Sequence, residues 1–172
     1  MNIGQQSIPT AYLDANLIIG IRKRDLASEQ APLSRLLKAH KQGTLSLVTS
    51  PETRREIEKR TPVHDGDEDI YALLADVPVA EGESLVPRPV TNLGGSRLIG
   101  PVVVITNDDL AFLRATLPDA LDANHVFQAI SNGVDYFVTA DSRTILRHAP
   151  AIESKYGIRL RLPSALVAEV GL

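Results

Sequence analysis

The sequence contains no cysteine among its 172 residues. This absence excludes a disulfide scaffold, a thiol nucleophile and a zinc finger. The four histidines lack the close spacing that is typical of a zinc site. No apolar run approaches the roughly 18 residues of a transmembrane helix, and the first residues lack the charged and apolar regions of a signal peptide. We therefore expect a cytoplasmic protein without a membrane partner.

A basic surplus is also missing, because 18 lysines and arginines face 21 acidic residues and the net charge is −3. Proteins that bind nucleic acid usually carry excess positive charge, which neutralises phosphates. The composition argues against an ordinary DNA-binding module, but it leaves open an enzyme whose acidic residues gather in one metal-neutralised site. The apolar content of 44% is ordinary for a globular protein, and the length indicates one domain over 1–172.

Strand-like and helix-like segments alternate along most of the chain. Strands are expected at 8–13, 45–49, 134–139 and 158–162. Helices are expected at 15–21, 31–41, 121–131, 141–148 and 164–170, and another begins at Ser50-Pro51 and stops before Pro62. Strands separated by helices predict an α/β fold, a three-layer α/β/α sandwich around a mostly parallel sheet.

The segment 61–101 differs from the rest, because it holds five of the eleven prolines and five of the eleven glycines. We expect it to be an insertion that is largely loop, and loops of this length in a compact domain are usually functional or mobile. The β-branched run 102–106 predicts a strand, although 77–79 competes for the same place in the sheet. A helix is expected to begin near Asn107 or Asp108.

Four carboxylates from distant parts of the chain are expected to meet at one edge of the sheet. Sites in open parallel sheets lie beyond the carboxyl ends of the strands. Asp14 and Asp141 follow the first and third expected strands. Glu56 lies on the helix after the second strand, and Asp122 lies near the start of the helix that leads into the third. Carboxylates packed together repel one another, and a hard divalent cation is the usual remedy.

Each carboxylate also has a structural explanation of its own. Asp14 and Asp141 suit helix N-caps, which is the commoner role for a lone aspartate in such a position. Glu56 suits a solvent-exposed helix face with neighbouring arginines, and Asp122 suits the positive end of its helix. The convergence of all four therefore carries the metal hypothesis, and no single residue does.

A Mg²⁺ or Mn²⁺ site of this kind supports phosphodiester cleavage, because the cation activates water and stabilises the departing oxygen. Asn16 and Ser50 lie near Asp14 and Glu56 in the sequence and could hold these carboxylates in place. Thr139 could do the same beside Asp141. One metal ion and two metal ions are equally compatible with the sequence.

At these residues the sequence resembles the PIN-domain (PilT N-terminus) family, which includes the VapC-like ribonucleases. YLDANLIIG is similar to the first-strand motif of that family, and VTSPETRREI is similar to its second block. DANHVFQAISNGVDYFVTAD is similar to its third and fourth blocks, of which the third is fairly specific. The match runs in register from Tyr12 to Asp141, and GIRLRLPSALVAEV suits the last strand and helix of the family.

The resemblance implies a sheet in the order 3-2-1-4-5 and a Mg²⁺- or Mn²⁺-dependent endoribonuclease that hydrolyses RNA. The acidic quartet that it implies for catalysis and metal binding is Asp14, Glu56, Asp122 and Asp141. Asp119 lies one turn before Asp122 and could assist. The resemblance further implies the toxin of a toxin–antitoxin pair, with an antitoxin protein as a partner, and we expect a homodimer.

The sequence departs from the family pattern at two places, and two other functions are considered beside the ribonuclease hypothesis. The segment 61–101 is longer than in a minimal VapC-like toxin, and Gln128 stands where a small residue is expected. A PIN-like domain could instead act mainly as a protein-interaction module with weak or no nuclease activity. A DNA-directed nuclease of the flap-endonuclease type ranks last, because the chain is short for the arches of such enzymes.

Arg22 and Arg143 adjoin the site-bearing segments and are the candidate RNA-binding residues. Without the acidic quartet, the charge balance is 18 basic to 17 acidic residues. Metal ions that neutralise the quartet would therefore leave a slightly basic protein. The sequence predicts that RNA binding depends on the metal.

Overall fold

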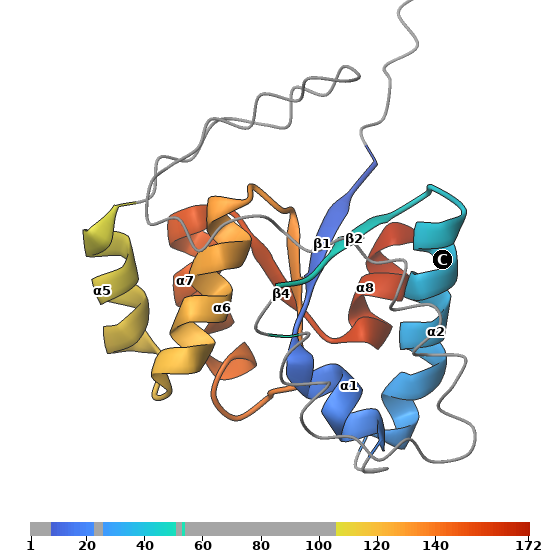
Figure 1. Ribbon diagram of the computed structural model, residues 1–172, viewed down its shortest axis with the longest axis horizontal. Helices are drawn as coiled ribbons and strands as arrows, with labels where there is room; N and C mark the ends of the chain where they lie inside the picture. Colours follow the sequence, from blue (N-terminus) through green and yellow to red (C-terminus); the bar gives the residue numbers. More distant parts are fainter. Residues whose placement is uncertain (1–7, 23–25, 51–52, 54–105) are drawn as a thin grey trace, which may run out of the picture.

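The computed structural model describes residues 8–22, 26–50, 53 and 106–172 (Figure 1). In this part of the chain four strands form one sheet, in which every neighbouring pair is parallel and the order is β2-β1-β3-β4. The strands are β1 (Thr10–Leu13), β2 (Ser46–Val48), β3 (Tyr136–Val138) and β4 (Arg159–Arg161). The predicted α/β class and the parallel sheet are confirmed in the described residues.

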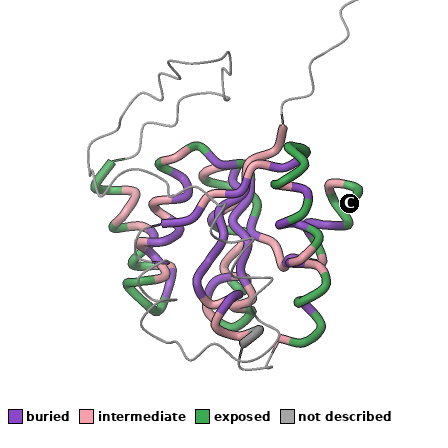
Figure 2. The backbone as a smooth tube through the Cα atoms, turned by 45° about the vertical axis from the view of Figure 1, so that its right-hand side comes forward, coloured by how far each residue is buried: buried purple, intermediate pink, exposed green. Residues whose placement is uncertain are grey.

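Six α-helices in the described residues cover both faces of the sheet (Figure 1). They are α1 (Ala15–Arg22), α2 (Ala27–Lys41), α5 (Asn107–Thr116), α6 (Ala120–Ser131), α7 (Ala149–Tyr156) and α8 (Pro163–Val170). Successive side chains of β1 point to opposite faces. Ala11 and Leu13 belong to the core beneath α1, α2 and α8, whereas Tyr12 belongs to the core beneath α5, α6 and α7. Figure 2 shows buried backbone concentrated along the strands between these layers.

Helix α2 begins at Ala27, four residues earlier than predicted, and Pro32 lies inside it. Proline removes one backbone hydrogen bond from a helix, so the first turn needs support from elsewhere. Glu29 in that turn is buried and accepts hydrogen bonds from the backbone N–H of Ser164, at 2.8 Å, and from its hydroxyl, at 2.9 Å. The first turns of α2 and α8 therefore hold each other across 135 residues of sequence.

The helix predicted at 141–148 is wrong. Residues 142–145 form turns, a 3-10 helix η1 covers Leu146–His148, and α7 follows from Ala149. The carboxylate of Asp141 accepts the N–H groups of Arg143 and Thr144, which favours a turn over a regular helix. Gly157 then ends α7 in a left-handed conformation with φ of 74°.

Helix α5 begins at Asn107, as predicted, with Thr106 and Asp109 in a capping box. Gly133 follows α6 with φ of 63°, the left-handed conformation that commonly ends a helix. The segment 61–101 and the strand expected at 102–106, apart from Thr106, lie outside the described residues. None of the described helices is both long and apolar enough to span a membrane.

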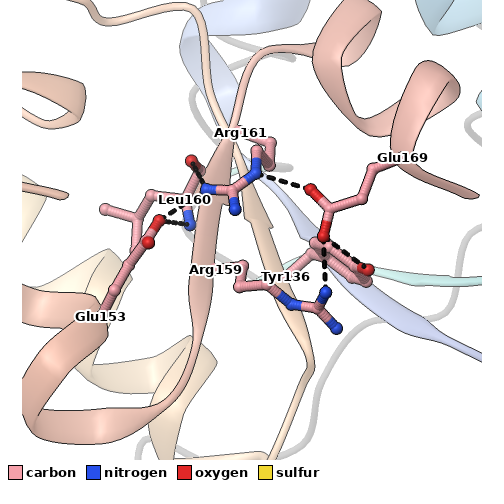
Figure 3. A network of polar contacts seen from close by, with 6 residues as sticks. All are labelled: Tyr136, Glu153, Arg159, Leu160, Arg161 and Glu169. Carbon is pink, nitrogen blue, oxygen red and sulfur yellow. Dashed lines mark hydrogen bonds and ion pairs between the residues drawn. The ribbon is translucent and has the colours of Figure 1, made fainter. Parts of the chain in front are cut away.

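The edge strand β4 carries a compact network of charges (Figure 3). Arg161 donates to Glu153 at 2.6 Å and to Glu169 at 2.7 Å, and Arg159 pairs with Glu169 at 2.5 Å. The Arg159 guanidinium also lies 4.3 Å from the centre of the Tyr136 ring. Glu153 accepts the backbone N–H of Leu160 at 2.9 Å, so the network joins α7, β4 and α8.

Candidate active site

Three of the four predicted carboxylates gather at the carboxyl edge of the sheet. Asp14 directly follows β1, and its backbone N–H donates to the carbonyl of Val138 at 3.0 Å. Asp141 lies just beyond β3, and Asp122 lies in the first turn of α6. The fourth, Glu56, lies outside the described residues. The topology brings these groups together because β1 and β3 are neighbouring parallel strands that end at the same edge.

Asp14 is almost fully buried, with 4% of its surface exposed, and a polar network holds it. Thr139 Oγ1 donates to Asp14 Oδ2 at 2.8 Å and accepts from Asn16 Nδ2 at 2.9 Å and from the backbone N–H of Asp141 at 3.1 Å. The one proton and both lone pairs of this hydroxyl are therefore used. Asn16 Oδ1 accepts from the backbone N–H of Ala140 at 3.2 Å. The sequence predicted that Asn16 supports Asp14 and that Thr139 supports Asp141. The Thr139 hydroxyl instead donates to the carboxylate of Asp14, and the side chain of Asn16 contacts that hydroxyl.

Burial raises the pKa of Asp14 to about 6, since a charged carboxylate is costly away from water. The hydrogen bond from Thr139 and the charge of His125 act in the opposite direction, while the charge of Asp122 raises the pKa further. In the described residues no lysine or arginine forms an ion pair with Asp14, Asp122 or Asp141. A metal ion would supply the positive charge that these carboxylates lack.

Thr144 joins the other two carboxylates, and the sequence reasoning missed it. Its hydroxyl contacts Asp122 Oδ2 at 3.0 Å and makes a shorter contact with Asp141 Oδ2. Its backbone N–H also donates to Asp141 Oδ1 at 2.7 Å. The signal in the sequence is the spacing of Asp141 and Thr144, because an aspartate that caps a turn commonly accepts the N–H three residues later.

Asp122 and Asp141 respond differently to this environment. Burial raises the pKa of Asp122, and the charges of Asp119 and Asp141 add to the effect. Burial also disfavours the charged form of Asp141, but the Thr144 hydroxyl and the nearby backbone N–H groups outweigh it and lower its pKa. Asp141 is therefore the more readily ionised of the two carboxylates that face Thr144.

A second polar network runs behind the carboxylates. The Tyr12 hydroxyl lies 3.0 Å from His125 Nδ1 on α6 and 3.4 Å from Thr53 Oγ1. Ser50 Oγ accepts from the backbone N–H of Thr53 at 3.0 Å, so Ser50 is the helix N-cap that the sequence predicted. This network links the chain after β2 to the helix that carries Asp122.

The other residues predicted for the site are Asp119, Arg143 and Arg22. Asp119 is the N-cap of α6 and accepts from the backbone N–H of Leu121 at 2.7 Å. Arg143 is exposed next to Asp141. Arg22 is the last residue of α1, and its side chain lies outside the described part of the structure.

The carboxylate oxygens at the carboxyl edge of the sheet are ligands that suit a hard cation. Among the described residues no three histidine or acidic side chains form a metal-binding group. Mg²⁺, however, is usually held by one or two carboxylates, with water and substrate phosphate completing the shell. Asp122 and Asp141, separated by one hydroxyl, with Asp14 in electrostatic range of Asp122, fit that pattern.

No protein-family model matches the chain, and no curated protein matches it. The resemblance to the PIN-domain family therefore rests on the sequence motifs. The placement of Asp14, Asp122 and Asp141 is shown by the hydrogen bonds that Thr139 and Thr144 make to them.

Proposed function

We propose that the protein is a Mg²⁺- or Mn²⁺-dependent endoribonuclease. The observation that carries this proposal is the gathering of Asp14, Asp122 and Asp141 at the carboxyl edge of a parallel sheet. Burial and mutual repulsion raise the pKa of Asp14 and Asp122, and no described lysine or arginine compensates them. Carboxylates whose pKa is raised in this way are typical of catalytic sites.

Some of the site residues would bind the cation, and others hold the binding residues in position. Asp14, Asp122 and Asp141, with Glu56, would hold the cation, and Asn16 and Thr139 fix the position of Asp14. When bound, Mg²⁺ or Mn²⁺ would activate water for attack on phosphorus and stabilise the departing oxygen. Arg143, exposed beside Asp141, and Arg22 would contact RNA phosphates.

The fold proposed for this function is PIN-like. The described strands β2, β1, β3 and β4 lie in the order that strands 2, 1, 4 and 5 have in a 3-2-1-4-5 sheet. Strand 3 of that sheet is the one without a counterpart among the described residues. A strand beside β2 would complete that order. The strand expected at 102–106 is the candidate for this place, 77–79 is the alternative, and an experimental structure of the full chain tests the choice.

Cleavage of RNA by the purified protein tests the proposal. We expect cleavage of a structured or single-stranded RNA in Mg²⁺ or Mn²⁺, no cleavage in EDTA, and loss of cleavage in Asp14→Asn. Asp108→Asn is the matched control, because Asp108 is exposed on α5 and the variant changes charge by the same amount. Cleavage that persists in EDTA or in Asp14→Asn contradicts the proposal.

The proposal extends to partners through the same family resemblance. The protein would act in the cytoplasm as a homodimer and as the toxin of a toxin–antitoxin pair. Co-purification with a small protein encoded next to it would support the toxin role. A protein that binds such a partner but cleaves no RNA under any metal condition would instead be an interaction module.

A further inference from the structure

Thr144 occupies the space between two carboxylates that come from different elements. Asp122 approaches from the first turn of α6, and Asp141 approaches from the turn after β3. The Thr144 hydroxyl contacts the Oδ2 atom of each, while Asp141 Oδ1 is held by the backbone N–H groups of Arg143 at 3.0 Å and Thr144 at 2.7 Å. One side chain therefore sets how far apart these two carboxylates lie.

The number of protons on the hydroxyl explains why this arrangement suits a cation. A threonine hydroxyl has one proton, so it can donate fully to only one carboxylate at a time. When Asp122 and Asp141 are both ionised, one of the two Oδ2 atoms lacks a donor from Thr144. Oxygen lone pairs that are fixed in place and left without a donor are suited to bind a hard cation.

We propose that Thr144 is a positioning residue, which fixes the spacing of Asp122 and Asp141 so that both present oxygen to one divalent cation. This inference rests on the proposed function and deepens it. Hydrogen bonds to metal ligands typically change metal affinity or activity by about 10- to 100-fold when they are removed. The effect of Thr144 should fall in this range.

Two substitutions separate the hydroxyl of Thr144 from its shape. Thr144→Val keeps the shape and removes the hydroxyl, whereas Thr144→Ser keeps the hydroxyl and removes the methyl group. Thr116→Val is the matched control, because the Thr116 hydroxyl donates to the carbonyl of Phe112 within α5 at 2.8 Å and contacts no site residue. Each variant is checked by circular dichroism, and Thr144→Ala replaces Thr144→Val if the latter does not fold.

The measurements are Mn²⁺ affinity by isothermal titration calorimetry, without RNA, and the kcat and KM of RNA cleavage. We expect Thr144→Val to weaken Mn²⁺ binding by about 10- to 100-fold and to lower kcat at fixed metal concentration, with KM for RNA unchanged. Thr144→Ser and Thr116→Val should stay within about threefold of the wild type.

Mn²⁺ binding by Thr144→Val at wild-type affinity would overturn this inference alone. A Thr144→Ser variant as weak as Thr144→Val would also overturn it, because the methyl group rather than the hydroxyl would then matter. A wild-type protein that binds no Mn²⁺ and cleaves no RNA would overturn the proposed function, and the inference with it.

Discussion

The two charged regions of the molecule are built on opposite principles. At β4, Arg159 and Arg161 pair with Glu153 and Glu169, and the hydrogen bond from Arg161 lowers the pKa of Glu169 (Figure 3). At the carboxyl edge of the sheet, burial raises the pKa of Asp14 to about 6. The first region balances its charges within the fold, whereas in the second no described lysine or arginine forms an ion pair with the carboxylates.

The two regions therefore differ in how their charges affect the stability of the fold. A paired carboxylate stabilises the fold at neutral pH, and an unpaired buried carboxylate destabilises it. A protein retains the second kind where a ligand or a reaction requires it. Removing a charge at the carboxylates should therefore raise stability and abolish RNA cleavage, whereas removing a charge at β4 should lower stability and leave cleavage unchanged. Three experiments compare the two regions.

The largest effect on stability is expected at Asp14. Its pKa is about 6 in the folded protein and about 3.9 in an unfolded chain, so the folded state binds the proton more tightly. The associated stability is present below about pH 4 and is lost as the pH rises through 6. We expect metal-free Asp14→Asn to be more stable than the wild type by about 2 to 3 kcal/mol at pH 8, and equal to it at pH 3.

Urea unfolding of both proteins in EDTA between pH 3 and 8 measures this difference. Addition of Mn²⁺ at pH 8 should stabilise the wild type and leave Asp14→Asn unchanged, because only the wild type keeps the full site. A stability difference that does not depend on pH would show that the charge of Asp14 is not its cause.

The second-largest effect on stability is expected at Thr139, which is fully buried beside Asp14. Thr139→Val removes the donor to Asp14 and the acceptor for the N–H of Asp141. We expect a loss of about 2 kcal/mol in the free energy of unfolding, as for buried polar groups left unpaired. The loss should be larger at pH 8 than at pH 4, because the hydroxyl favours the ionised form of Asp14.

Thermal or urea unfolding of Thr139→Val and Thr116→Val at both pH values checks this expectation. Thr116→Val loses a hydroxyl within α5, away from the carboxylates, so its loss should not depend on pH. Equal losses in Thr139→Val at pH 4 and pH 8 would contradict the role assigned to its hydroxyl.

The smallest effect is expected in the paired region at β4. Arg161→Met removes the bridge between Glu153 and Glu169, and we expect it to cost about 1 kcal/mol of stability. Arg159→Met should cost less than about 0.5 kcal/mol, since Arg159 is 46% exposed and pairs with one carboxylate. RNA cleavage should be unchanged in both variants at 25 °C, and reduced cleavage in either one would weaken the division between the two regions.

Much of the fold and of the candidate site follows from local sequence patterns. The carboxyl ends of parallel strands meet at one edge, so the placement of Asp14 and Asp141 beside each other follows from finding β1 and β3. Ser50 before Pro51 predicted a helix start, and the helix expected at 121–131 ends at Ser131, as α6 does. These signals depend on a few neighbouring residues, which a sequence displays directly.

Two of the features that the sequence did not reveal depend on contacts over a distance, and one depends on a local contact. Glu29 is buried because it caps α8, and no pattern around residue 29 shows that contact. The helix predicted at 141–148 was wrong because the Asp141 side chain competes for backbone N–H groups, and α7 was therefore missed. The spacing of Asp141 and Thr144 is a local signal, but the contact of the Thr144 hydroxyl with Asp122 spans 22 residues, and no pattern around residue 144 shows it.

The pairing of β1 with β3 also determines when the site can exist during synthesis. The hydrogen bond from Thr139 to Asp14 spans 125 residues, and the two strands are direct neighbours in the sheet. A growing chain therefore exposes Asp14 on the order of 10 s before its partner is made, at ordinary translation rates. The contact between β1 and β3 that holds Asp14 therefore forms only after residues 136–139 have been synthesised.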